Sequence, residues 1–155
     1  MDSERLNRWL TLGANLGVLV GIILLIVELD QNREMMKSQT RNELSNNIVI
    51  LLSEAAGNTE LASIMHRAFT GDELTPVQAL QFLHRQYAMF RYWENVHYQY
   101  RMGLYDDSEY AAHFEGWRSY INYAKAIADE WCSFRGVANE EFVSDIDSLM
   151  TEYSC

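Results

Sequence analysis

The chain has 155 residues, enough for one domain and a membrane segment but too few for two independent hydrophobic cores. Its 22 acidic and 12 basic residues give a formal net charge of −10. An electrostatic nucleic-acid binder needs clustered Lys and Arg, so DNA and RNA are not expected partners. The single proline, Pro76, and only 8 glycines leave few places to interrupt a helix, and this composition predicts an all-α protein.

An uncharged apolar segment runs from Trp9 to Val27, WLTLGANLGVLVGIILLIV. As an α-helix it would be about 28 Å long at roughly 1.5 Å per residue, which is enough to cross the core of a bilayer. Arg5 and Arg8 flank it on one side and Glu28 and Asp30 on the other, and Trp9 stands where an interfacial aromatic residue anchors a span. The sequence therefore predicts one transmembrane helix, residues 9–27, after a tail of residues 1–8.

A cleaved signal peptide is the main alternative for this segment. The apolar region of a signal peptide is shorter and is followed by small residues, whereas here Leu25, Ile26 and Val27 lead directly into Glu28. We therefore expect a retained single-pass anchor.

Three glycines lie four residues apart within the predicted span. Gly13, Gly17 and Gly21 form two overlapping GxxxG motifs on one helix face, where a second backbone can approach closely. Asn15 lies off this stripe and would gain an interhelical hydrogen bond in the hydrocarbon region. Although glycine is common in membrane spans, this arrangement favours self-association or packing against a partner helix.

The basic residues around the span bear on its orientation. Arg5 and Arg8 precede it, and Arg33, Lys37 and Arg41 follow it. Because cytoplasmic flanks carry an excess of Lys and Arg, this nearly even balance slightly favours a domain in the cytoplasm.

The residues after the span predict a stalk and a helical bundle. Residues 28–58 contain no proline, and no glycine before Gly57, so we expect the membrane helix to continue outwards as a stalk. Apolar residues return only at 48–52, so only the distal part of this stalk is expected to pack into the domain. The bundle itself is assigned to residues 59–155.

Four further helical stretches are expected in the bundle. A short helix over 60–69 ends at Gly71, and Thr75-Pro76 begins a long helix that continues to Gly103. A second long stretch runs from about 107 to 136 and pairs with the first as an antiparallel hairpin; its only internal weak point is Gly116. A last helix is capped by Asn139. In the second long stretch the apolar stripe consists of Tyr110, Phe114, Trp117, Ile121, Ala124, Ala128 and Trp131.

Polar residues follow the apolar stripe of the first long helix. That stripe, Leu80, Leu83, Tyr87 and Phe90, is continued by Glu94, His97 and Arg101. Folding the hairpin about Tyr105 would bring His97 level with His113 and place Glu109 near Arg101. A Glu and a His three residues apart share one helix face, as in the carboxylate-bridged metal sites of helical bundles.

These residues define a candidate metal site of Glu94, His97, His113 and Glu109. A second Glu-x-x-His motif is missing, so such a site would be incomplete or assembled between subunits. The alternative, which we favour, is a hydrogen-bonded network in which Glu94 pairs with Arg91 or Arg101 and His97 bonds a tyrosine.

Aromatic residues are frequent in both long helices, and they admit two interpretations. They would line a pocket for an apolar or heterocyclic ligand, or they would form the core and a protein interface, which we favour. Cys132 and Cys155 either pair or remain free. No nucleophile elbow, phosphate-binding glycine loop or HExxH motif is present, so the sequence identifies no cofactor and gives enzyme chemistry little support.

The glycine-rich span followed by ELDQN, the run WENVHYQYRMGLYDD, a downstream Trp and the closing FVSDID resemble a family of small bacterial single-pass membrane proteins. The resemblance extends over most of the chain. It implies one span in a bacterial inner membrane and a helical domain, with no catalytic residues to carry over. The function expected first is a non-catalytic homo-oligomeric scaffold or accessory subunit, with another membrane protein as a further possible partner. The alternative is a membrane-tethered domain that binds a metal or a small ligand.

Overall fold

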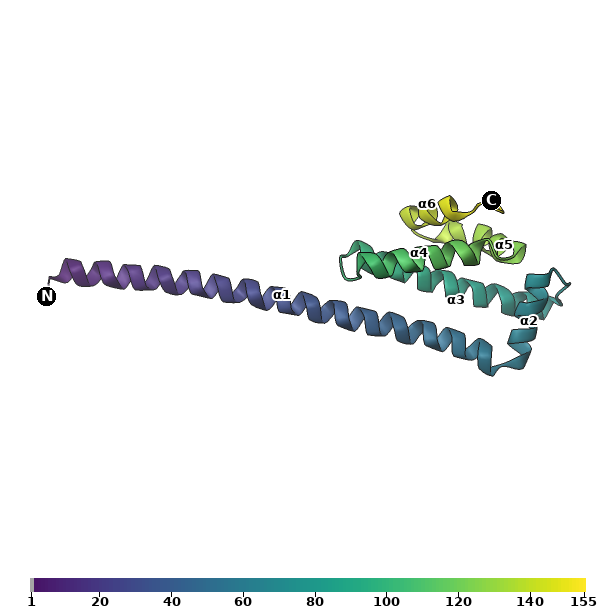
Figure 1. Ribbon diagram of the computed structural model, residues 1–155, viewed down its shortest axis with the longest axis horizontal. Helices are drawn as coiled ribbons and strands as arrows, with labels where there is room; N and C mark the ends of the chain where they lie inside the picture. The colour runs from purple at the N-terminus through teal and green to yellow at the C-terminus, as the bar shows by residue number, and fades with distance from the viewer. Residues whose placement is uncertain (1) are drawn as a thin grey trace. The chain divides into compact units, whose positions relative to one another are not determined.

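The computed structural model describes residues 2–155. These residues form six α-helices and one short 3-10 turn without any β-strand, so the all-α prediction is confirmed (Figure 1). The chain divides into two compact units, Met1–Gln39 and Thr40–Cys155. The elements are α1 (Ser3–Gly57), α2 (Thr59–Thr70), α3 (Pro76–Arg101), α4 (Asp107–Ile121), α5 (Lys125–Phe134), η1 (Arg135–Val137) and α6 (Glu140–Leu149).

In the first unit, α1 contains one stretch long and apolar enough to cross a membrane, as expected for residues 9–27. The large apolar side chains of this stretch, from Trp9 at 71% exposure to Val27 at 48%, are exposed on the helix. No atom lies within 4 Å of a Cβ built on Gly13, Gly17 or Gly21. By length and composition, this helix could span a membrane.

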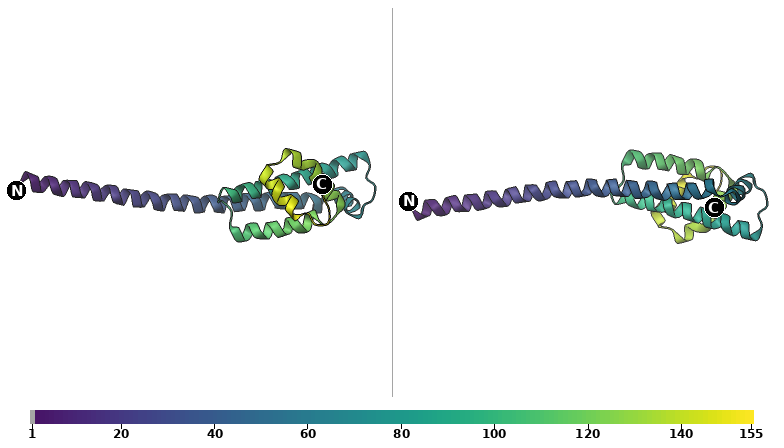
Figure 2. Two further views of the ribbon diagram at one scale, coloured as in Figure 1. Left: turned by 90° about the horizontal axis from the view of Figure 1, so that it is seen from above. Right: turned by 90° about the horizontal axis from the view of Figure 1, so that it is seen from below.

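The second unit begins at Thr40, within the segment 28–58 that the sequence suggests as a stalk. Here Leu44 of α1 is buried, and Ile48 and Leu51 pack against the same core. The return of apolar residues at 48–52 therefore reflects packing into the domain. In the remainder of this unit, α3 runs antiparallel to α4 and contacts α2 and α5, while α6 contacts α4 (Figures 1 and 2).

The starts and ends of α2 and α3 follow from local sequence. Gly71 ends α2 in a left-handed conformation, with a φ of 80° that few other residues adopt. Thr75 and Gln78 form a capping box at the start of α3, with Pro76 at its first position. Both boundaries were predicted.

The stretch 107–136, expected to be one helix, is interrupted. α4 ends at Ile121 and α5 begins at Lys125, whereas Gly116, the expected weak point, lies inside α4. The prediction of a continuous helix was therefore wrong.

Asn122 explains the interruption. Its side-chain nitrogen donates to the carbonyl of Leu149 at 2.8 Å, and its side-chain oxygen accepts from the backbone N–H groups of Thr151 and Glu152. These bonds tie the end of α4 to the segment after α6. They stabilise a non-helical conformation at Asn122, because its side-chain amide then satisfies three backbone groups that are distant in sequence.

The core is aromatic and is centred on α3. The stripe predicted for the second long stretch does face inwards, from Trp117 and Ile121 to Trp131. The stripe predicted for α3 is partly wrong: Leu80 is 54% exposed, and the buried face instead starts at Phe82. The fully buried aromatic residues Phe90, Trp131, Phe134 and Phe142 form its centre.

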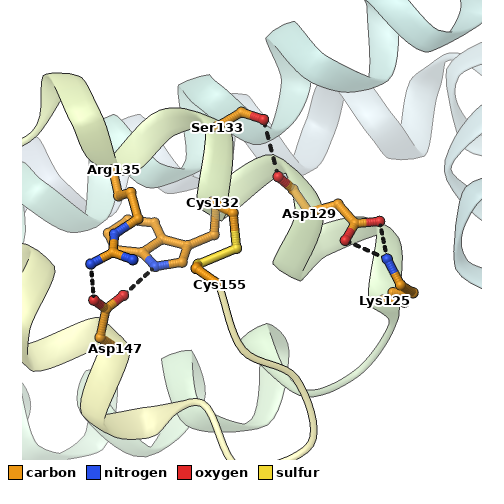
Figure 3. The surroundings of a disulfide bond; sticks show 8 residues. Lys125, Asp129, Cys132, Ser133, Arg135, Asp147 and Cys155 are labelled. Atoms are coloured by element: carbon orange, nitrogen blue, oxygen red, sulfur yellow. Dashed lines mark hydrogen bonds and ion pairs between the residues drawn. A yellow bond between two sulfur atoms is a disulfide. The ribbon is translucent and has the colours of Figure 1, made fainter.

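A disulfide joins Cys132 of α5 to Cys155 (Figure 3). The Cα atoms are 5.4 Å apart, a normal separation for this bond. Close to it, Asp147 accepts hydrogen bonds from the indole Nε1 of Trp131 at 2.9 Å and from Arg135. The C-terminal segment is thereby held against α5 by covalent and polar contacts.

Candidate functional site

The residues of the candidate metal site have separate partners. Glu94 accepts hydrogen bonds from Arg91 and from the backbone N–H of Asn139 at 2.8 Å. The Nε2 of His97, a buried residue, lies 3.1 Å from a carboxylate oxygen of Asp145 on α6. Both side chains of the Glu-x-x-His motif therefore connect α3 to the last helix and the segment before it.

Glu109 and His113 lie on α4 and bond elsewhere. Glu109 pairs with Arg41 of α1 at 2.6 Å, and Arg101 pairs with Glu141, so Glu109 and Arg101 form no ion pair with each other. His113 Nε2 lies 2.9 Å from the hydroxyl of Tyr105. Within residues 2–155 no group of three or more His, Cys, Asp and Glu side chains is arranged to hold a metal ion.

A groove of about 460 Å³ lies between α1, α3 and α4 in the second unit. Trp93 and Trp117 stack at its wall with ring centroids 5.5 Å apart and planes 22° from parallel. Gly116 also lines the groove, and a Cβ built there meets no atom within 4 Å. The groove is lined by Arg41, Ser45, Ile48, Met89, Tyr92, Trp93, Tyr105, Glu109, Ala112, His113, Gly116, Trp117 and Tyr120.

The polar part of this lining includes several hydrogen-bond donors. Trp117 is only 3% exposed, and its indole Nε1 has no hydrogen-bond partner among the described residues. Burial, with a smaller effect of Tyr105, raises the pKa of Tyr92 to about 12, so this phenol keeps its proton. The lining carboxylate, Glu109, is already paired with Arg41. The groove therefore offers an apolar aromatic surface with donors that suit an acceptor atom of a ligand.

His113 is neutral in this environment. Burial lowers its pKa, and the nearby carboxylate of Glu109 opposes this effect only in part. A neutral imidazole both donates and accepts, so Nε2 of His113 pairs with the Tyr105 hydroxyl without a net charge in the groove.

Two buried polar residues of α3, neither of which lines this groove, were missed by the sequence interpretation. Arg85 is 6% exposed and Gln86 is fully buried. The Nε and Nη1 atoms of Arg85 and the Nε2 of Gln86 have no partner within the described chain, whereas Gln86 Oε1 accepts from Tyr120 at 3.1 Å. Their signal in the sequence is a polar pair within the apolar spacing Phe82, Met89, Trp93 and Val96.

Comparisons of the chain with protein-family models, curated proteins and solved structures give no match. The groove is therefore interpreted from its own geometry.

Proposed function

We propose that the chain is a membrane-anchored binding domain, whose groove between α1, α3 and α4 takes a small molecule with a flat apolar body and a hydrogen-bond acceptor. The observation that carries this proposal is Trp117, which lines the groove and whose Nε1 is buried without a partner among the described residues. A buried donor without a partner costs about 1–3 kcal/mol, and native proteins rarely keep one. An acceptor on a ligand removes that cost, and the stacked indoles supply the apolar contact area.

The distribution of the aromatic side chains supports a ligand over an aromatic protein interface. In the second unit the large rings mostly pack against each other inside the domain. Among the described aromatic residues of this unit, Tyr98 and Tyr123 are exposed, at 55% and 67%. The aromatic surface that an interface requires is thus small, whereas the groove keeps five aromatic residues in its lining.

Binding of 2-naphthamide to the full chain in phosphatidylcholine nanodiscs tests the proposal. This neutral probe has a flat apolar body and an amide oxygen as its acceptor. We expect saturable binding by isothermal titration calorimetry above the signal of empty nanodiscs. The change Gly116→Leu should abolish it, because Gly116 lines the groove and a Cβ at this position meets no atom within 4 Å.

Gly136→Leu is the matched control, since Gly136 also has open space around it and does not line the groove. Binding that is the same in both variants would contradict the groove as the binding site. Absence of binding to the natural chain would contradict the proposed class of ligand.

The second candidate is the homo-oligomeric scaffold or accessory subunit, which is favoured by the open glycine face of Gly13, Gly17 and Gly21. Two such helices would pack closely through these positions, and Asn15 would add an interhelical hydrogen bond. Native mass spectrometry of the gently solubilised chain should then give one discrete oligomer, which Gly17→Leu weakens. A strictly monomeric natural chain would contradict this candidate.

We propose that the domain faces an oxidising compartment. For a single-pass protein of a bacterial inner membrane, this compartment would be the periplasm. The Cys132–Cys155 disulfide supports this side over the cytoplasm that the basic residues slightly favour, because cytosolic thiols are kept reduced. A membrane-impermeant maleimide applied to intact cells tests it. The two cysteines should react only after a reductant is added, and thiols that react without reductant but only after cell lysis would contradict it.

A further inference from the structure

Tyr92 of α3 brings an unpaired hydroxyl to the groove. The residue is 7% exposed and belongs to the groove lining. Its hydroxyl takes part in none of the hydrogen bonds of residues 2–155, in contrast to the hydroxyls of Tyr105 and Tyr120, which also line the groove. The fully enclosed, unpaired polar atoms of this part of the chain belong to other residues. Tyr92 thus combines a place in the groove lining with an accessible hydroxyl that lacks a partner.

The neighbours of this hydroxyl leave it free to donate. The ring of His113 meets the ring of Tyr92 edge-on, with centroids 6.3 Å apart. His113 Nε2 lies 2.9 Å from the Tyr105 hydroxyl, so these two neighbours are bonded to each other. Burial and, less strongly, Tyr105 raise the pKa of Tyr92 to about 12, so the phenol keeps its proton at neutral pH. A protonated phenol without a partner can donate to an acceptor atom of a ligand.

The charged side chains of the groove are already paired with each other. Arg41 Nε and Glu109 Oε1 lie 2.6 Å apart, and both residues line the groove. Burial lowers the pKa of His113, so the imidazole adds no charge at neutral pH. A charged ligand would therefore find no free counter-ion among the described lining residues, and a charge removed from water without a partner is costly. The groove suits an uncharged ligand.

We propose that the groove takes an uncharged aromatic carbonyl compound, and that Tyr92 selects this ligand by donating its hydroxyl to the carbonyl oxygen. The inference rests on the proposed function, which requires an acceptor on the ligand but fixes neither its charge nor the phenol that binds it. A carbonyl oxygen accepts hydrogen bonds without carrying a net charge, whereas a carboxylate would add a negative charge to a groove that already holds Glu109. The apolar body of the ligand would lie against Ile48, Met89 and Trp93.

The first test measures how much Tyr92→Phe, which removes only the hydroxyl, weakens the binding of two probes of similar shape. 2-Acetylnaphthalene has a carbonyl acceptor and 2-isopropylnaphthalene has none. With the full chain in phosphatidylcholine nanodiscs, we expect the variant to bind 2-acetylnaphthalene about 3- to 10-fold more weakly, the effect of one hydrogen bond, and 2-isopropylnaphthalene less than about twofold more weakly. Partition of a probe into lipid cancels in this ratio of variant to natural chain. Tyr98→Phe, which changes an exposed tyrosine of α3 outside the groove lining, should alter neither affinity.

The second test concerns the charge of the ligand. The natural chain should bind 2-naphthoate at least about 10-fold more weakly than 2-naphthamide, because the acid meets no free counter-ion. Glu109→Gln leaves Arg41 without its partner and should tighten 2-naphthoate by about threefold or more, a modest gain because Arg41 is largely exposed. Glu115→Gln removes a carboxylate that pairs with Arg118 outside the groove lining, and it should leave the affinity for 2-naphthoate as it is.

The outcomes separate this inference from the proposed function. If 2-naphthamide does not bind the natural chain, the proposed function fails. If 2-naphthamide binds and Tyr92→Phe weakens 2-acetylnaphthalene and 2-isopropylnaphthalene equally, the role of Tyr92 is overturned and the groove stands. Binding of 2-naphthoate as tight as that of 2-naphthamide overturns the choice of an uncharged ligand. This last comparison uses the natural chain, so it decides the charge of the ligand even if Tyr92→Phe does not fold.

Discussion

Two buried tryptophans of the same core differ in whether the indole N–H group has a hydrogen-bond partner. Trp131, on α5, donates to a carboxylate oxygen of Asp147 at 2.9 Å, and that carboxylate also accepts from Arg135. Trp117, on α4, is almost as deeply buried, yet its Nε1 has no partner in the described chain. The comparison separates a C-terminal side, where the buried indole N–H meets an acceptor of the protein, from a groove side, where the buried indole N–H has none among the described residues.

A similar contrast holds for two arginines, of which Arg85 does not line the groove. Arg135 is partly exposed and paired, whereas Arg85 is buried and unpaired. Polar groups that stabilise a fold are satisfied within it, and groups that bind a ligand are satisfied only in the complex. We therefore assign the C-terminal side to structure and the groove side to binding.

The disulfide should give the largest effect on stability, on the structural side. Replacing both Cys132 and Cys155 by Ser frees the segment after α6 and removes a crosslink across 23 residues. We expect a loss of roughly 3 kcal/mol, or a melting temperature lower by about 10 °C, in thermal unfolding followed by circular dichroism. A melting temperature equal to that of the natural chain under non-reducing conditions would contradict a formed disulfide.

The two tryptophans provide the next, paired prediction. Trp131→Phe removes a hydrogen bond to a carboxylate, whereas Trp117→Phe removes an N–H group that has no partner. Both variants lose a similar ring volume. We therefore expect the free energy of unfolding of Trp131→Phe to be about 2 kcal/mol lower than that of Trp117→Phe, measured by urea unfolding without ligand. Equal losses would show that the two indoles do not differ in this way.

The arginines should respond in opposite directions. Arg85→Met should raise the free energy of unfolding of the ligand-free protein by about 1 kcal/mol or more, because it removes an unpaired buried charge. Arg135→Met should lower it, since Asp147 loses its ion-pair partner. A clear destabilisation in Arg85→Met would indicate that Arg85 serves the fold.

The smallest expected effect concerns pH. The pKa of His113 lies below its usual value of 6.5, mainly because the ring is buried, so the unfolded chain binds a proton more readily than the folded one. The stabilisation from neutral His113 is then complete above pH 6.5 and is lost as pH falls through the lower, folded-state pKa. Between about pH 7.5 and about pH 5 the natural chain should lose more stability than His113→Gln. An identical pH dependence of the two proteins would contradict the buried, neutral imidazole.

Local patterns were enough to predict much of the fold. The capping residues Thr75 and Asn139 mark the starts of α3 and α6, because their side chains bond backbone groups within three residues. The break at Asn122 was not predictable in this way, since the groups its amide satisfies, such as the carbonyl of Leu149, lie 27 residues or more away.

The candidate site shows the same limit. His97 was expected to face inwards and it does, but its partner Asp145 comes from α6, whose position no hairpin argument provides. Arg85 and Gln86 were missed because the α3 stripe was started at Leu80, which is exposed, instead of Phe82. A polar pair in the middle of an apolar helix face is the pattern that would have found them.

The most direct test of the account is the indole N–H spectrum of the full chain in nanodiscs, with 15N-labelled tryptophan, during titration with 2-naphthamide. The chain has 4 tryptophans, and single Trp→Phe variants assign their signals. We predict that the Trp117 signal moves downfield and saturates as its N–H gains an acceptor, while the Trp131 signal stays in place. Movement of Trp131 with no change at Trp117, or no saturable change at either, would contradict the assignment of the groove side to binding.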